Sequence, residues 1–133
     1  MNNDLVGKEI DPFLEKLAQI AEIGVEYGVT IYVSGLIVTG TIINAAKYFE
    51  LTSEKLKANG DKVITQYTDA ISAVVNKAYE SNPNYRKDSI GFINLKNAKI
   101  LNGDKLIPGE GGLLWRAKIS SVDAFNLGIL ESS

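Results

Sequence analysis

The chain of 133 residues contains no cysteine and no histidine. Without cysteine it has no disulfides and no thiolate chemistry. Without histidine it lacks the commonest general base and the commonest transition-metal ligand. An enzyme of this composition has to use carboxylates, Lys, Tyr, Ser or Thr. No set of these residues has the sequence spacing of a catalytic site. We therefore expect no catalytic residues, no metal and no cofactor.

The chain also has no large excess of positive or negative charge. The net charge is −2, so the overall charge does not favour a nucleic-acid partner. The distribution is less even. Residues 1–26 carry six carboxylates and two lysines, a net charge of −4, and residues 86–118 carry seven cations and three carboxylates, a net charge of +4. Two interpretations stay open: solvated faces of mixed charge, or an acidic and a basic end that meet in neighbouring molecules.

From the sequence we expect neither a signal peptide nor a membrane-spanning helix. Its first residues, MNNDLVGKEID, lack a basic segment followed by an apolar core. The most apolar segment, residues 29–46, is interrupted by Thr, Ser and Gly and is rich in β-branched residues. This composition favours a β-hairpin over a membrane-spanning helix.

The start of the chain predicts a flexible arm and a helix. Residues 1–10 have the features of a loose arm. Asp11 and Pro12 have the features of an N-cap followed by a proline at the first helical position. Apolar residues then recur every three or four positions, which predicts an amphipathic helix that ends near Gly28.

A hairpin follows the helix. Residues 29–33 and 36–44 are rich in Val, Ile and Thr, as β-strands are, and Ser34-Gly35 predicts a two-residue turn between them. Gly40 lies in the middle of the second strand. A glycine there indicates a sharp bend or a close contact with another backbone.

Two helices are predicted next, as an insertion at about residues 45–80. Asn44 has the features of the first cap, and Asp61 begins the second helix. The second helix carries a wide apolar stripe composed of Val63, Ile64, Tyr67, Ala70, Ile71, Val74, Val75 and Ala78. Residues 81–89 are predicted to be a loop.

The third strand is predicted at residues 91–101. Ile93 and Leu95 share one face, but Ala98 and Ile100 are out of phase with them, so we expect a β-bulge near Asn97. The glycine-rich residues 103–112 lack the spacing of a P-loop and are interpreted as a flexible connection.

Residues 112–130 predict the last two strands. Trp115, Ala117 and Ile119 alternate with Arg116 and Lys118, so the only Trp faces the core and the two cations face outward. The alternation breaks at residues 120–124, where we expect a turn. The whole pattern predicts one α+β domain over residues 11–133, with a strongly bent five-stranded antiparallel sheet or an Sm-like barrel.

Five polar residues are candidate interaction residues. Arg116 and Lys118 form either a solvated strand face or a docking patch for an acidic surface, since Arg can bind carboxylates through two nitrogens. Asp123 is interpreted as a turn cap, with a salt bridge to Arg116 or Lys118 as the alternative. Lys96 and Asn97 lie on the third strand, where polar residues of an Sm-like protein can contact RNA. Exposed tyrosines are further candidates for self-association.

Three segments carry a family resemblance: SGLIVTGTIINAAKYFE at residues 34–50, FINLKNAKI at 92–100 and WRAKISSVDAFNLGIL at 115–130. Together, in order and in approximate spacing, they are similar to the gas vesicle accessory protein U family. The WRxKIxxVDxFxLG pattern is the most specific part. The resemblance covers about residues 12–130.

The resemblance implies a cytoplasmic, non-enzymatic accessory protein associated with gas vesicles. It implies that the partners are the gas vesicle surface or other gas vesicle proteins, and further copies of the same chain as a homo-oligomer. Clustering of vesicles through self-association is the expected function. The alternative from the predicted fold is an Sm-like oligomeric module that binds nucleic acid, which the near-neutral charge disfavours.

Overall fold

The structure is a computed structural model that describes residues 11–131 except 59, 61 and 82–90. The predicted arm, residues 1–10, lies outside the described residues. In chain order the elements are α1 (Pro12–Glu22), β1 (Tyr27–Val33), β2 (Leu36–Ile43), α2 (Ala45–Lys57), α3 (Lys62–Ser81), β3 (Phe92–Asn102), β4 (Lys105–Ile107), β5 (Leu113–Lys118), the 3₁₀ turn η2 (Ile119–Ser121) and β6 (Val122–Leu127).

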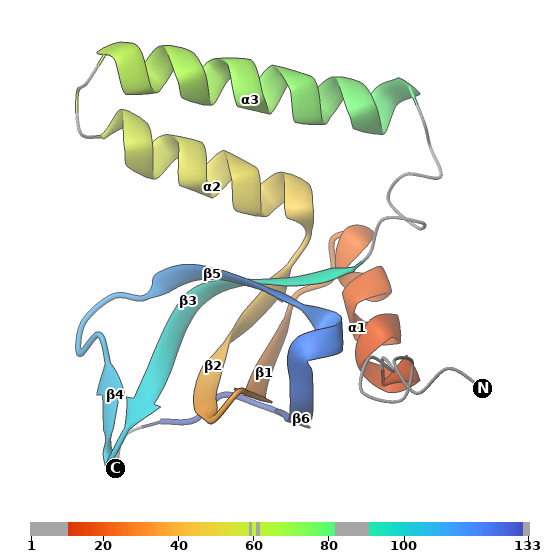
Figure 1. The fold of residues 1–133 in the computed structure, drawn as a ribbon, viewed down its shortest axis with the longest axis vertical. Helices are drawn as coiled ribbons and strands as arrows, with labels where there is room; N and C mark the ends of the chain where they lie inside the picture. The colour runs from red at the N-terminus through yellow and green to blue at the C-terminus, as the bar shows by residue number, and fades with distance from the viewer. Residues whose placement is uncertain (1–10, 59, 61, 82–90, 132–133) are drawn as a thin grey trace.

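The strands form one bent antiparallel sheet with the order β4-β3-β2-β1-β6, and β5 pairs with β3 beside β4 (Figure 1). In the described part of the chain, β6 pairs only with β1, and β4 and β5 pair only with β3. The two outer edges therefore do not meet, and the sheet is open. The chain is an α+β protein as predicted, but the Sm-like barrel is not confirmed.

The sheet has six strands, whereas the sequence predicted five. The additional strand is β4, inside the segment that was interpreted as a flexible connection. Its residues pair with the end of β3, with Leu106 opposite Leu101 and Lys105 opposite Asn102. Gly103 has a φ of 65°, which allows the tight turn between the two strands. A three-residue strand gives too short an alternation to be detected by its pattern.

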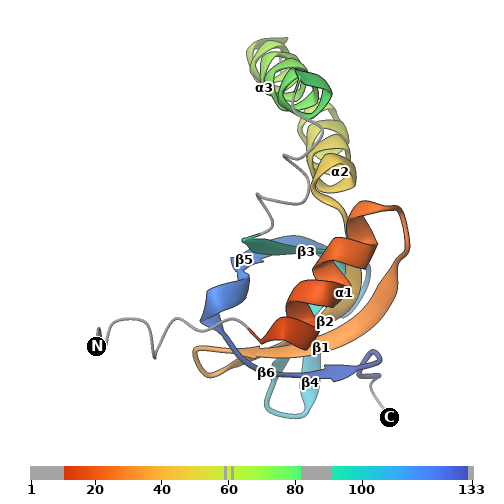
Figure 2. The same ribbon diagram turned by 90° about the vertical axis from the view of Figure 1, so that its right-hand side faces the viewer.

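Helix α1 lies against the sheet and completes the core (Figure 2). It begins where predicted, because the Asp11 carboxylate accepts hydrogen bonds from the backbone N–H groups of Phe13 at 2.7 Å and Leu14 at 3.3 Å. Its buried side chains pack on the apolar residues of β1, β2, β3 and η2. The core consists of Leu14, Leu17, Ala18, Ala21, Val29, Ile31, Val33, Val38, Ile42, Ile93, Leu95, Ala98 and Ile119.

The predicted bulge in β3 lies between two glycines. The register of β3 shifts between Leu95 and Ala98 against β5, and Asn97 has a φ of 53°. A Cβ added at Gly40 of β2 would lie 3.1 Å from the Ala98 Cα atom. A Cβ added at Gly112, just before β5, would lie 2.4 Å from the Asn97 Cα atom. The neighbouring segments of the chain approach the bulge closely because glycine has no side chain.

Two threonines fix the end of the chain to the outer face of the hairpin. The hydroxyls of Thr30 and Thr39 lie 3.0 Å apart, and both residues are buried. Thr30 donates to the Gly128 carbonyl at 2.9 Å, and the Leu130 N–H donates to the Thr39 hydroxyl at 2.9 Å. Residues 128–130 therefore cross β1 and β2 instead of leaving the sheet.

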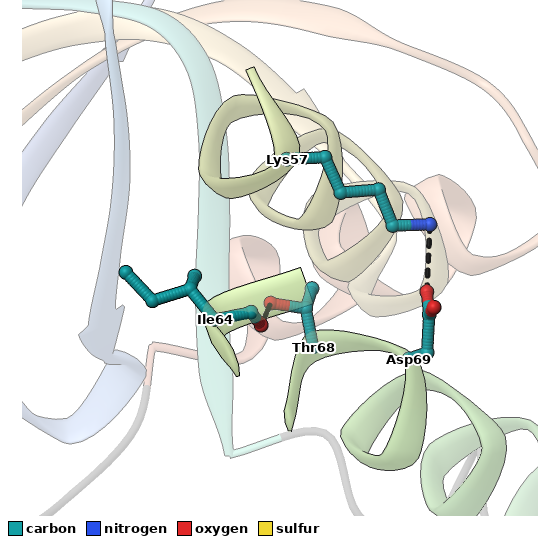
Figure 3. A network of polar contacts seen from close by, with 4 residues as sticks. All are labelled: Lys57, Ile64, Thr68 and Asp69. Atoms are coloured by element: carbon teal, nitrogen blue, oxygen red, sulfur yellow. Dashed lines mark hydrogen bonds and ion pairs between the residues drawn. The ribbon is translucent and has the colours of Figure 1, made fainter. Parts of the chain in front are cut away.

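Helices α2 and α3 form a hairpin that projects from the sheet, with α2 between α3 and the strands (Figures 1 and 2). Asn44 caps α2 by accepting from the Lys47 N–H at 2.7 Å. An ion pair of 2.6 Å joins Lys57 of α2 to Asp69 of α3, and Thr68 donates to the Ile64 carbonyl (Figure 3). The ion pair is half-exposed, so it contributes at most about 1 kcal/mol.

Gly112→Ala tests the close contact at the bulge. The new methyl group would overlap the Asn97 backbone, which has to move, so we expect the free energy of unfolding to fall by about 1–3 kcal/mol. Gly109→Ala is the control, because a Cβ there meets nothing within 4 Å. Urea denaturation of the two variants checks this expectation. Equal stability of the two variants would contradict the close contact.

Thr39→Val tests the attachment of the chain end. Valine keeps the shape but removes the hydroxyl that binds the Leu130 N–H, at a cost of about 1–3 kcal/mol. We expect lower stability in urea and faster hydrogen exchange at the Leu130 amide. Thr41→Val, on the same face of the same strand, is the control and should leave that amide unchanged. Unchanged exchange in Thr39→Val would rule out this attachment.

Candidate functional site

One face of strand β5 is directed to the core and the other is directed outward, as the alternation predicted. Trp115 and Ala117 are partly buried against the core. Arg116 and Lys118 are exposed on the opposite face. Arg116 lies opposite Asn94 of β3, and Lys118 lies opposite Phe92. The register therefore places both cations on the sheet face that carries Phe92.

The Arg116 guanidinium contacts two aromatic rings. Its central carbon lies 4.0 Å from the centroid of the Phe92 ring on β3 and 5.3 Å from the centroid of the Phe49 ring on α2. Tyr48 packs edge-on against Phe49, with 5.7 Å between the ring centroids. We call Phe49, Phe92 and Arg116 the arginine cluster. It joins α2 to the sheet and limits the freedom of the Arg116 side chain.

No described residue occupies the hydrogen-bond donors of the arginine cluster. Within the described residues, the Arg116 side chain makes no hydrogen bond and no ion pair, and neither does Lys118. An aromatic face attracts a guanidinium but does not occupy the fork of N–H groups that binds a carboxylate. This face therefore carries the kind of donors that an anion requires, with Arg116 as the oriented group and Lys118 beside it.

Lys96 and Asn97 lie near the bulge, at one side of an open groove of about 390 Å³ between α2 and the sheet. Lys96 forms an ion pair of 2.6 Å with Glu26. One residue from the acidic segment and one from the basic segment therefore meet within a single chain. The groove is lined by Leu51, Glu54, Lys55, Ala58, Lys96, Asn97, Gly112, Leu113 and Leu114.

Asp123 lies apart from the other candidates. It is on β6, because the turn occurs earlier than predicted, at η2. Its carboxylate accepts a hydrogen bond of 3.2 Å from the Ser34 N–H, in the turn between β1 and β2. Asp123 thus caps the turn of a neighbouring hairpin, and the structure shows neither of the salt bridges considered from the sequence.

The described residues contain neither a cluster of metal-binding side chains nor a helix that could span a membrane. No group of three or more Asp or Glu side chains is arranged to hold a metal ion there. No helix in that part of the chain has the length and apolar character needed to cross a membrane.

The family described as "Gas vesicle protein GvpU-like" matches residues 11–130. The chain belongs to the GvpU-like family. This confirms the resemblance that the three sequence segments indicated. No curated protein and no solved structure matches the chain.

The GvpU-like chain has a further surface feature that its sequence did not identify as exposed. Helix α3 carries a row of apolar side chains that are 55–70% exposed: Val63, Tyr67, Ile71 and Val74. The sequence showed the apolar stripe, but periodicity alone cannot tell a stripe that faces the core from one that faces solvent. Tyr67 is thus an exposed tyrosine of the kind expected for self-association, whereas Tyr27, Tyr32 and Tyr48 are half-buried.

Proposed function

We propose that this GvpU-like chain is a non-enzymatic accessory protein that self-associates, binds gas vesicles and clusters them in the cytoplasm. Family membership connects the chain to gas vesicles. The single observation that carries the clustering function is the exposed apolar row on α3, composed of Val63, Tyr67, Ile71 and Val74. We call this row the α3 stripe.

The α3 stripe is continuous. Each residue of an α-helix is turned by about 100° from the previous one, so the four side chains lie within an arc of about 80°. With a rise of about 1.5 Å per residue, they span roughly 16 Å along the helix. The spacings of four, four and three residues add up to eleven, the repeat of a right-handed coiled coil, and place neighbouring side chains of the row one helical turn apart.

The side chains of this stripe stay 55–70% exposed beside the contact between α3 and α2. The side of α3 that meets α2 buries Thr68, which is 4% exposed, while Tyr67 beside it is 70% exposed. Asp69 is held by the ion pair with Lys57. A helix that buries a threonine and exposes tyrosine, isoleucine and valine does not have the distribution expected of a solvated surface.

The occupant that we propose for the α3 stripe is the α3 stripe of a second copy. Two helices with coiled-coil spacing pack by inserting each apolar side chain between those of the partner. A patch of this kind exposes roughly 300–600 Å². Two such patches bury at most about 1,200 Å² together, the low end for a stable interface.

Weak pairing suits a clustering function. A contact at the low end of interface size is short-lived between two free molecules. When many copies on one vesicle face many copies on another, many weak contacts form together. The overall avidity then rises although each contact stays small. Two observations disfavour the alternative function, a module that binds nucleic acid. The net charge of the chain is −2, and Lys96 forms an ion pair with Glu26.

Sedimentation velocity at increasing protein concentration tests the self-contact. Tyr67→Lys combined with Ile71→Lys places two charges in the α3 stripe, and we expect self-association to weaken at least tenfold because the charges have to be desolvated. Both side chains are exposed, so the fold should remain intact by circular dichroism.

The control places the same two charges on another exposed sector of α3. Gln66→Lys combined with Ala73→Lys adds lysines at exposed positions that are about 100–120° from the middle of the α3 stripe. This variant should self-associate like the wild type. Equal behaviour of the two double variants would remove the α3 stripe from the mechanism.

Flotation with purified gas vesicles tests the vesicle partner. The wild-type chain should rise with the vesicles and saturate as its concentration increases. A chain that stays in solution with intact vesicles would contradict the proposed function, whatever its oligomeric state.

A further inference from the structure

Strand β5 combines an open edge with two outward cations on one face. We propose that it binds an extended acidic segment of another gas vesicle protein, which adds to the edge of β5 and places glutamates on alternate residues against Arg116 and Lys118. The statement that the segment belongs to a gas vesicle protein rests on the proposed function. The binding chemistry depends on β5 and the arginine cluster alone.

The edge of β5 is available for pairing. One side of β5 pairs with β3, from Lys118 opposite Phe92 to Leu113 opposite Ala98. Among the residues described, no strand pairs with its other side. Such an edge presents unpaired backbone N–H and C=O groups, and an extended peptide can satisfy them by becoming the next strand.

The two cations match the repeat of an extended peptide. Arg116 and Lys118 are two residues apart in a strand, so they lie on one face about 6.5–7 Å apart. Side chains on alternate residues of an added strand have the same separation, and directly opposite pairs lie about 4.5–5.5 Å apart between Cβ atoms. Carboxylates on alternate residues therefore lie beside positions 116 and 118 at once, and the carboxylate beside Arg116 has to reach across β5 to the guanidinium, which lies over Phe92 of β3.

The arginine cluster favours carboxylates over nucleic acid. The guanidinium lies 4.0 Å from the Phe92 centroid, so that face of the ring is not free to stack on a base. The fork of Arg116 remains available and matches the two oxygens of a carboxylate. Because Phe92 belongs to β3, the long side chain of glutamate reaches the guanidinium better than that of aspartate.

Fluorescence anisotropy with labelled peptides tests this proposal on the full chain. The probe is a peptide of alternating Glu and Thr, and the comparison peptide has the same composition with all Glu residues at one end. We expect saturable binding of the alternating peptide and at least fivefold weaker binding of the block peptide. Equal affinity for the two peptides would overturn strand addition.

Variants of the cluster test the residues. Arg116→Gln should weaken binding of the alternating peptide about tenfold, the effect of losing a charge-assisted hydrogen bond. Arg116→Lys keeps the charge but loses the fork, so most of the loss should remain. Lys105→Gln, an exposed lysine of β4, removes one charge elsewhere and should bind normally. An unchanged emission spectrum of Trp115 shows that β5 is still folded.

Three results would overturn the proposal: no binding of the alternating peptide by the wild type, an equal loss in Lys105→Gln and Arg116→Gln, or tighter binding of an oligodeoxythymidylate than of the peptide. These results are distinguishable from failure of the proposed function. Self-association through the α3 stripe should be unchanged in Arg116→Gln, and flotation with gas vesicles reports vesicle binding separately.

Discussion

The contact of the β3 bulge with glycines on both neighbours determines the course of the sheet. Gly40 of β2 and Gly112 before β5 bring their backbones against the bulge at Asn97; a Cβ at Gly112 would collide with β3, and a Cβ at Gly40 would be in tight contact with it. The left-handed backbone of Asn97 shifts the register at this point. Because of the shift, the first half of β3 pairs with β5 and its far end pairs with β4, so one strand supports two partners along the same edge.

This arrangement keeps the two proposed binding surfaces apart. The α3 stripe lies on the helix farthest from the strands, whereas Arg116 and Lys118 lie on the sheet itself (Figure 1). Helix α2 lies between them, and its Phe49 ring contacts the Arg116 guanidinium of β5. A protein with two separated surfaces can hold a copy of itself through one and a vesicle protein through the other. That property is what linking particles requires.

Local signals predicted much of the fold. The caps at Asp11 and Asn44, the turn at Ser34-Gly35 and the bulge near Asn97 were all visible because each depends on a few neighbouring residues. Strand β4 was missed because a three-residue strand, although it pairs with the adjacent end of β3, is too short to show an alternation. The other misses depend on contacts between distant segments: the open edges depend on the path of the whole sheet, and the Glu26–Lys96 ion pair joins residues that are 70 positions apart. For the site, the sequence identified Arg116 and Lys118 as outward cations but not the rings around Arg116 or the exposure of the α3 stripe.

The measurement that tests the account most directly separates vesicle binding from vesicle clustering. Purified gas vesicles are mixed with equal amounts of wild type, of the Tyr67→Lys/Ile71→Lys variant or of Arg116→Gln, and flotation and light scattering are recorded on the same samples. If the two surfaces act as proposed, the wild type binds and clusters, the α3 variant binds without clustering, and Arg116→Gln binds weakly and clusters little. Full clustering by the α3 variant would contradict this mechanism, because the contact between copies would then lie elsewhere on the molecule.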